Sequence, residues 1–479
     1  MNHLDFSPSE FQAFVQSALE LVQRRYDHLD QNVYSNLKQS QVREWFDEAL
    51  PNEGMAWTDL LEQVEQKVFD RATLNIGPNM YAYVVSGGNQ VSMVGDFLAS
   101  AIDQNVAKWH LAPTITELEQ RVIAWAGEYI GYSSRAGGML VSGGSAANLS
   151  GLTVARNLFL EKQQVRRRGL FQLKPIIVYG SDQTHNSVDK SIQMLGIGQD
   201  NYRKIASDGK GAIDCDKLVR AIEDDLESGL MPFCIVGNAG TVNAGHLDPL
   251  DTQADIAERY GLWFHVDGAY GGLAAALPEL RPLFKGLERA DSVACDFHKW
   301  LYQPFEVGCT LVRDWKDLNR TYHVTADYLS RVPGAENRLD ITEHHFQLSR
   351  NAKALKVWMT FKAFGAERLR DMIRKDIALR IYLETLINDA SDFEYVASGP
   401  LGIVCFRYLG NGTGDSLQVD DLNRKLLAAL EADGRVFITG TQWAGRQVIR
   451  ACIINHRTQK QDIEHLVGVI REVGRSLLA

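Results

Sequence analysis

The sequence contains a series of short, near-continuous apolar runs separated by amphipathic stretches, and this pattern limits the possible folds strongly. Runs of this kind are typical of strands buried on both faces of a parallel sheet, and the stretches between them have helical periodicity. The predicted strands are residues 175–179, 232–236, 262–266, 292–295 and 309–312, and predicted helices include 214–226 and 251–260. This alternation predicts an α/β fold with a large, doubly wound, mainly parallel sheet and a site at the carboxyl ends of its strands.

The 479 residues exceed what one simple core accommodates, so we expect more than one domain. We predict an N-terminal helical segment over 1–75, a large domain over 76–350 and a small α+β domain over 351–479. The last begins with a long helical stretch that should break at Gly365, because glycine weakens helix interiors. Strands at 402–408 and 447–454, with a helix at 419–432 between them, complete it.

The first helix has a readable start. Ser7 is a suitable N-cap, Pro8 suits the first helical position and Glu10 completes a capping box. An apolar stripe follows at helical spacing, made of Phe11, Phe14, Val15, Ala18, Leu19 and Val22. Such a stripe must be covered, either by the same subunit or by a second copy in a dimer.

Charge and cysteine content exclude several classes of function. The net charge of −10 argues against nucleic-acid binding, which usually needs a basic surface. None of the six cysteines forms a CxxC pair or falls at zinc-ligand spacing with histidines, so we predict no metal and a reducing, cytoplasmic location. No signal peptide and no apolar run of transmembrane length is visible, so we expect no membrane partner.

Two charged residues follow predicted strands and suggest a cofactor. Lys299 comes just after the run 292–295 among large apolar residues, which should lower its pKa and favour a Schiff base with an aldehyde. Asp267 ends the run 262–266, and the separation of 299 − 267 = 32 residues is about one βαβ crossover. A lysine and a carboxylate on neighbouring strands are what pyridoxal phosphate (PLP) requires, since the carboxylate keeps the pyridine nitrogen protonated. Singly, a lysine of this kind is more often a surface residue, and such an aspartate is about as often a strand-end turn residue.

Two further segments could complete such a site. VSGGSAANL at 141–149 combines a strand-like run, a small-residue turn and a helix start. The turn, with Gly144 and Ser145, could bind a phosphate through backbone N–H groups. His185, in a loop after the strand at 175–179, could stack on a flat cofactor. The four segments are predicted at one edge of the sheet.

Three motifs resemble a known family: HKW at 298–300, HVDGAYGG at 265–272 and APTITELEQ at 112–120. On these residues the chain resembles the group II PLP-dependent amino-acid decarboxylases, among them aromatic-L-amino-acid, histidine and glutamate decarboxylases. The resemblance implies PLP as cofactor, the fold-type-I PLP-transferase fold, and a homodimer with active sites at the interface.

The resemblance also implies residue roles. Lys299 would form the Schiff base, Asp267 would pair with the pyridine nitrogen and His185 would stack on the ring. The other implied cofactor contacts are Gly144, Ser145, Ser292 and Asp296 at the phosphate, Thr241 near the cofactor and His298 on the substrate side. Many relatives have asparagine at position 296, and a carboxylate suits a phosphate less well.

The expected reaction is removal of the α-carboxylate from an L-amino acid to give an amine and CO2. By the same resemblance, Tyr328, in TADYLSR, matches the family's tyrosine that protonates the α-carbon, and a tyrosine there favours plain decarboxylation over aldehyde formation. An aromatic substrate is the first candidate, but the substrate positions Val84, Ser86, Asn105 and Ala107 are smaller or more polar than in aromatic decarboxylases. Acidic, basic and aliphatic amino acids remain alternatives. So do aminotransferase, aldehyde synthase and carbon–carbon lyase activities, and a catalytically inactive scaffold.

Overall fold

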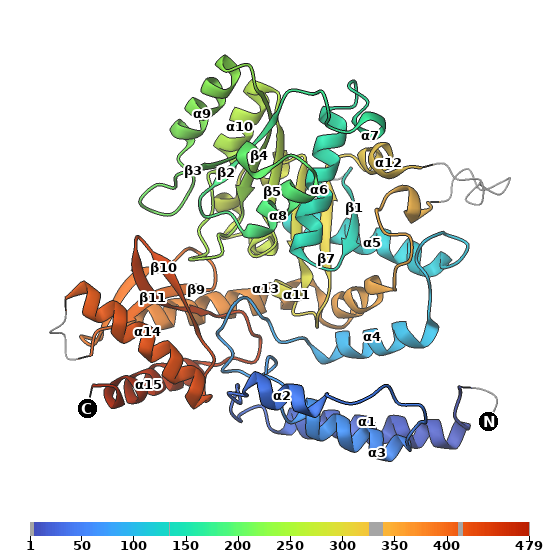
Figure 1. The fold of residues 1–479 in the computed structure, drawn as a ribbon, viewed down its shortest axis with the longest axis vertical. Coiled ribbons are helices and arrows are strands. Elements are labelled where there is room, and N and C mark those ends of the chain that lie inside the picture. The colour runs from blue at the N-terminus through green and yellow to red at the C-terminus, as the bar shows by residue number, and fades with distance from the viewer. Residues whose placement is uncertain (1–3, 134, 325–338, 411–414, 479) are drawn as a thin grey trace.

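The computed structural model describes residues 4–133, 135–324, 339–410 and 415–478, and contains two sheets joined by one long helix (Figure 1). The strands are β1 Gly137–Val141, β2 Ile176–Ser181, β3 Tyr202–Ile205, β4 Met231–Asn238, β5 Trp263–Gly268, β6 Ser292–Asp296, β7 Gly308–Val312, β8 Phe393–Ala397, β9 Ile403–Tyr408, β10 Thr439–Trp443 and β11 Arg446–Cys452. The helices are α1 Pro8–Asp27, α2 Gln39–Trp45, α3 Trp57–Val64, α4 Gln90–Ile102, α5 Pro113–Ile130, α6 Gly144–Phe159, α7 Val165–Arg168, α8 Asn186–Met194, α9 Cys215–Glu227, α10 Leu250–Tyr260, α11 Phe297–Trp300, α12 Lys316–Tyr322, α13 Lys353–Asn388, α14 Ser416–Asp433 and α15 Lys460–Ser476.

The large sheet has the strand order β1-β7-β6-β5-β4-β2-β3. The pairs β2–β3, β2–β4, β4–β5 and β5–β6 are parallel, as the continuous apolar runs predict. Within this sheet β7 runs in the reverse direction, because it pairs antiparallel with both β6 and β1. The eleven residues between Asp296 and Gly308 are too few for the helical crossover that a parallel neighbour needs. Since β1 is antiparallel to β7, its carboxyl end lies at the same edge as those of β2, β5 and β6.

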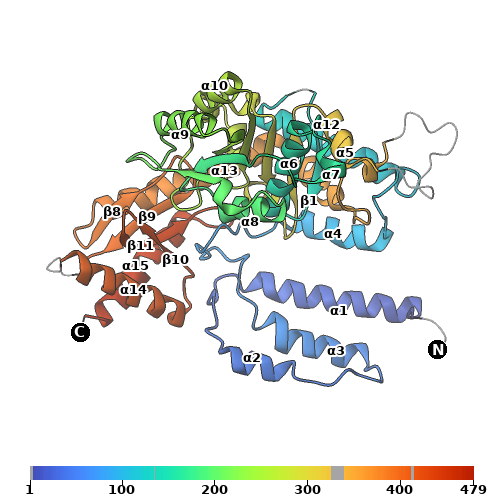
Figure 2. The same cartoon turned by 45° about the horizontal axis from the view of Figure 1, so that its top comes forward.

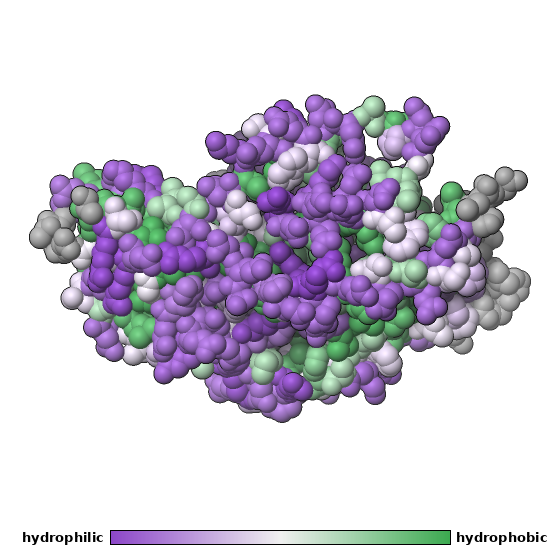
Figure 3. All heavy atoms as spheres, turned by 90° about the horizontal axis from the view of Figure 1, so that it is seen from below, coloured by the Kyte–Doolittle hydropathy of each residue, from purple (hydrophilic) through white to green (hydrophobic). Residues whose placement is uncertain are grey.

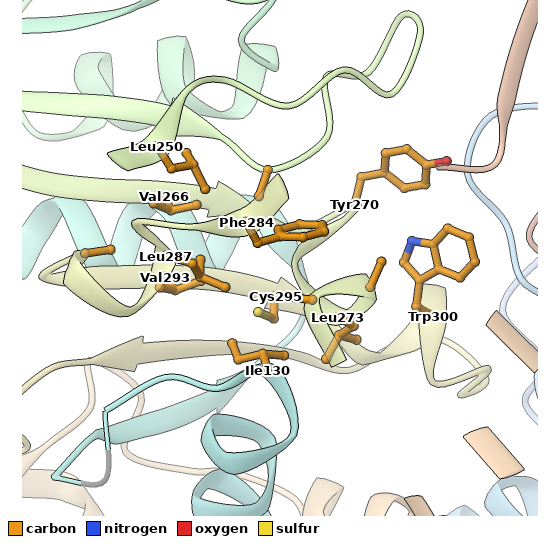
Figure 4. Packing of buried hydrophobic residues seen from close by; sticks show 14 of the residues in the cluster. Ile130, Leu250, Val266, Tyr270, Leu273, Phe284, Leu287, Val293, Cys295 and Trp300 are labelled. Carbon is orange, nitrogen blue, oxygen red and sulfur yellow. The ribbon is translucent and has the colours of Figure 1, made fainter. Parts of the chain in front are cut away.

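Helices cover both faces of this sheet. Alternate residues of β2 point in opposite directions: Ile177 and Tyr179 pack in the cluster that contains α5 and α10, whereas Ile176 and Val178 pack with α6 and α8. Figure 4 shows the first of these layers, in which Phe284 and Leu287 lie beside Val266 and Val293. This three-layer arrangement fixes the strand ends rigidly.

The second sheet is antiparallel, with the order β10-β11-β9-β8, and packs on α14, α15 and the second half of α13. The break predicted at Gly365 is present as a residue with φ 71° and ψ 159° inside α13. The first half of α13 contacts α4 and α5 next to the large sheet. α13 therefore connects the two sheets, and its direction changes at Gly365.

The N-terminal helices form a layer that stands apart from the rest of the chain (Figure 2). The predicted capping box of α1 is present, with the Glu10 N–H donating to Ser7 Oγ. Phe14 packs on Trp57 of α3, but Phe11 and Leu19 of the predicted stripe are exposed. The same subunit thus covers only part of the stripe. Among the described helices, none has the length and apolar character needed to cross a membrane.

Candidate active site

A cavity of about 1030 Å³ lies at the carboxyl edge of the large sheet, where the small sheet faces it. All four segments singled out in the sequence contribute to its wall: the β1–α6 turn, the β2–α8 turn, the end of β5 and the residues after β6. The parallel direction of β2, β5 and β6, together with β1, brings their ends to this edge. The clustering of these segments therefore follows from sheet topology.

The β1–α6 turn forms one end of the cavity. Ser142, Gly143, Gly144, Ser145 and Ala146 line it, and the N–H groups of the first turn of α6 begin here. A Cβ at Gly144 would lie 2.8 Å from the Cβ of Ala269, so a side chain there would push the turn away from β5. A sixteen-residue helix that starts on a glycine turn presents free N–H groups and a positive dipole end, which suits a phosphate.

Lys299 lies on the short helix α11 and its side chain is 18% exposed. The neighbouring Trp300 is fully buried and stacks on Tyr270 with ring centroids 5.9 Å apart, which anchors the helix (Figure 4). Lys299 Nζ lies 3.0 Å from Asp296 Oδ2. The apolar surroundings predicted for this lysine are therefore only partly present, because strand β6 ends on a buried carboxylate.

Asp296 has one oxygen without a partner in the described chain. Its Oδ2 contacts Lys299 Nζ and lies 3.5 Å from His298 Nε2, whereas the buried Oδ1 accepts no hydrogen bond from a described residue. A buried acceptor of this kind is suited to a hydrogen-bond donor. A phosphate oxygen is itself a negatively charged acceptor, so the two would repel each other.

Asp267 lies at the end of β5, in register with Ala294 of β6. Asn148 Nδ2 donates to Asp267 Oδ2 at 3.0 Å and the Ala269 N–H donates to Oδ1 at 3.1 Å. Two donors hold the buried carboxylate in place, with its open side toward the cavity. A carboxylate so placed can pair with a cationic ring nitrogen.

His185 is the N-cap of α8 and opens into the cavity. Its Nδ1 accepts the Ser187 N–H at 3.1 Å. The surrounding protein lowers the pKa of the imidazole mainly by burial, which outweighs the attraction of Asp267. The ring is therefore held neutral near pH 7, in a position to lie against a flat ligand.

The remaining predicted residues differ in whether they line the cavity. Val84 and His298 line the cavity, and the buried Ser86 donates from Oγ to the His298 carbonyl at 2.7 Å. Thr241 does not line it, although its neighbours Gly240 and Val242 do. Tyr328 lies outside the described residues.

Besides Ser86 and Thr241, three further predicted residues are not part of the cavity wall in the described chain: Ser292, Asn105 and Ala107. Ser292 begins β6, at the opposite end of that strand from Asp296, and its Oγ contacts His265 and Trp263. Asn105 accepts the Arg350 N–H, and the Ala107 carbonyl accepts the Thr342 N–H, so both contact the stretch of chain that precedes α13.

Several lining residues were not predicted from the sequence. The small sheet and its flanking loop contribute Phe437, Ile438, Thr439, Gly440, Thr441 and Arg450. Asn148 and His265, which lie behind Asp267, were not predicted either. A signal for both existed: His265 is two residues before Asp267 on one strand, and Asn148 is one helical turn after Gly144.

The fold and this set of groups define an α/β enzyme that holds a phosphate-bearing aldehyde cofactor with a pyridine ring. The comparisons agree, because a model of the pyridoxal-dependent decarboxylase conserved domain matches residues 40–409. The chain belongs to the pyridoxal-dependent decarboxylase family. Its cofactor is PLP, its fold is of type I, and it is a decarboxylase.

Individual relatives cover nearly the whole chain. Aromatic-L-amino-acid decarboxylase of Bacillus atrophaeus is 32% identical over 477 residues, 99% of this chain and 98% of that protein. Tyrosine decarboxylase 3 of Petroselinum crispum is 31% identical over 446 residues, 91% of this chain and 85% of that protein. The crystal structure of Oryza sativa TDC with PLP and tryptamine superimposes with a TM-score of 0.94 at 25% identity, covering 99% of this chain and 100% of that one.

Proposed function

We propose that the chain decarboxylates an aromatic L-amino acid to the amine and CO2, with Lys299 as the covalent attachment point of PLP. The observation that carries this proposal is the meeting of Lys299, Asp267, His185 and the α6 N-terminus in one cavity. No group of three or more metal-ligating side chains suited to a metal ion occurs among the described residues.

Each residue has a distinct task in the proposal. The bound cofactor supplies an aldehyde carbon and a cationic ring that accepts the electrons of the broken carbon–carboxylate bond. The α6 turn, with Gly144 and Ser145, holds the phosphate. Asp267 keeps the ring nitrogen protonated, since an ion pair at ~4 Å and an effective dielectric near 20 is worth roughly 4 kcal/mol. His185 lies against the ring, and His298 lies on the substrate side.

The aromatic assignment has two supports. Decarboxylases named for aromatic substrates are among the relatives. The cavity wall itself carries the aromatic side chains of Tyr83, Phe305 and Phe437. These rings provide flat apolar surface for an aromatic substrate, although Val84 is small.

We further propose that the working unit is a homodimer. Asn105 and Ala107 lie outside the cavity of their own subunit, which is consistent with a contribution to the partner's site. Tyr328 is assigned to protonation of the α-carbon by its position in TADYLSR alone.

The test is a substrate screen with the PLP-loaded enzyme, measuring CO2 and amine. We expect turnover of aromatic amino acids, and Lys299→Ala should lower it roughly a thousandfold or more. Lys299→Arg is the matched variant, because it preserves the positive charge beside Asp296 but cannot attach the cofactor. Release of a keto acid, or turnover by Lys299→Arg at the wild-type rate, would contradict the proposal. CO2 release from acidic amino acids alone would contradict the aromatic assignment.

A further inference from the structure

A continuous chain of hydrogen bonds, buried from Ser292 to Ser187, runs behind the cavity and ends on both Asp267 and His185. Asn148, one helical turn after the start of α6, is its branch point. Asn148 Nδ2 donates to Asp267 Oδ2 at 3.0 Å and to Ser187 Oγ at 2.9 Å. Asn148 Oδ1 lies 2.9 Å from His265 Nε2, so every polar atom of this amide has a partner. The residue is 1% exposed.

The direction of each bond follows from one chemical fact. A carboxylate only accepts, so the amide nitrogen of Asn148 must face Asp267 and the amide oxygen must face His265. His265 must then carry its proton on Nε2 and use Nδ1 as an acceptor. Ser292 Oγ lies 2.8 Å from that Nδ1 and donates to it, while Trp263 Nε1 donates to Ser292 Oγ at 2.9 Å.

The second branch sets the tautomer of His185. His185 Nδ1 accepts the Ser187 N–H at 3.1 Å and lies 2.8 Å from Ser187 Oγ. Because Ser187 Oγ accepts from Asn148, its own hydrogen is free to point to Nδ1. The proton of the neutral imidazole is therefore on Nε2. The Ser187 N–H alone requires Nδ1 to accept, and the Ser187 hydroxyl, held by Asn148, adds a second donor to the same atom.

Burial supports a chain of fixed direction. His265 is fully buried, and burial lowers its pKa to about 4, so the ring is neutral at physiological pH and can act as donor and acceptor at once. Ser292 is also fully buried. In surroundings that exclude water, a reversed or broken bond leaves a group unpaired, which costs more than the bond contributes.

We propose that Asn148 is a positioning residue that couples Asp267, which it contacts directly, to His185, which it reaches through Ser187, and that His265 and Ser292 fix the orientation of its amide. This rests on the proposed roles of Asp267 and His185 toward PLP. It also gives Ser292 a task that differs from the predicted phosphate contact.

The test uses alanine variants and two readouts apart from activity: the PLP dissociation constant and the pH midpoint of the absorbance of the bound cofactor near 420 nm. Asn148→Ala should weaken PLP binding about tenfold or more, since Asp267 loses a charge-assisted bond. The midpoint should rise by about one pH unit, because Asp267 without the Asn148 bond is more basic and takes the ring-nitrogen proton, and an unprotonated ring nitrogen would no longer repel the proton at the lysine–cofactor nitrogen.

Ser292→Ala tests the series of hydrogen bonds on the far side of His265, and the substitution adds no volume. We expect the same directions with smaller size, about threefold in affinity, and recovery in Ser292→Thr, which restores the hydroxyl. Ser150→Ala is the matched control: Ser150 is fully buried on the same helix, and its hydroxyl donates to the carbonyl of Ala146. It should change neither readout.

The outcomes separate the two proposals. Wild-type protein that binds no PLP would overturn the proposed function. Wild-type protein that binds PLP, with Asn148→Ala and Ser292→Ala showing wild-type affinity and midpoint, would overturn the coupling alone. Equal shifts in Ser150→Ala would also overturn it, since they would reflect general loosening of α6.

Discussion

Asp376, in the second half of α13, is a fully buried carboxyl group away from the proposed chemistry. Tyr302 Oη donates to its Oδ2 at 2.8 Å, and Oδ1 has no hydrogen-bond partner among the described residues. Burial raises the pKa of Asp376 from 3.8 to about 7, with the Tyr302 hydrogen bond opposing part of that rise. A carboxyl group whose pKa is higher in the folded than in the unfolded state favours folding most when it is protonated.

The sign of the pH effect follows. The contribution of Asp376 is fully present below about pH 4 and is lost as the pH rises through about 7. Asp376→Asn stays neutral and can still accept from Tyr302. We expect it to exceed the wild type in free energy of unfolding at pH 8 by an amount on the order of 2–4 kcal/mol, and to match it near pH 4. Urea unfolding at the two pH values measures this, and a variant less stable than the wild type at pH 8 would refute it.

Two helical glycines, one in α13 and one in α15, affect the stability of their helices in opposite ways. Gly365 has a φ of 71° and a ψ of 159°, which only glycine adopts readily, and a Cβ added there would meet no described atom within 4 Å. Gly468 lies inside α15, and a Cβ added at that position would be equally unobstructed. Because an added Cβ meets nothing at either site, alanine substitutions there test the backbone conformation apart from side-chain packing.

Alanine at these two positions should change stability in opposite directions. Gly365→Ala should lower the free energy of unfolding by about 1–3 kcal/mol through backbone strain. Gly468→Ala should raise it by about 0.5–1 kcal/mol, because alanine loses less conformational freedom in a helix. Denaturant unfolding of both variants is the measurement. If both variants changed the free energy of unfolding in the same direction, the break in α13 would not depend on the backbone conformation of Gly365.

On the surface of the molecule, several large apolar side chains near the N-terminal layer are exposed to solvent. Val94, Phe97, Leu98 and Ile102 of α4 are each 42–55% exposed, and Figure 3 shows apolar patches on the face viewed from below. Phe11 and Leu19 of α1 are each 55% exposed. A second copy of the chain is the proposed cover, since exposed apolar groups of this extent mark interfaces.

The proposed role of this surface as a dimer interface can be tested by introducing charged side chains on α4. Phe97→Glu combined with Leu98→Glu should halve the mass measured by light scattering and lower decarboxylation at least about tenfold, because each cavity would lose its contribution from the partner. Leu226→Glu is the control, since Leu226 is 48% exposed on α9, far from α4 in Figure 1. A dimer that survives the double change, or one that Leu226→Glu disrupts equally, would place the interface elsewhere.

Much of the fold was predictable from local pattern. The runs that became β2, β4, β5, β6 and β7 and the capping box of α1 were all predicted to within two residues. β3, β8 and β10 were missed, because their residues are only partly buried and carry a weaker apolar signal. The boundaries at residues 75 and 350 stay predictions.

The family, the cofactor and the residues at the strand ends could be predicted from the sequence, because they depend on short motifs and on the alternation of strand and helix. Three features became visible only in the folded chain: β7 is antiparallel to β6, Asp296 pairs with Lys299, and Ser292 lies behind the site with His265 and Asn148. Such contacts join residues distant along the chain, and their partners follow from sheet order and strand direction. A local pattern carries no information about either.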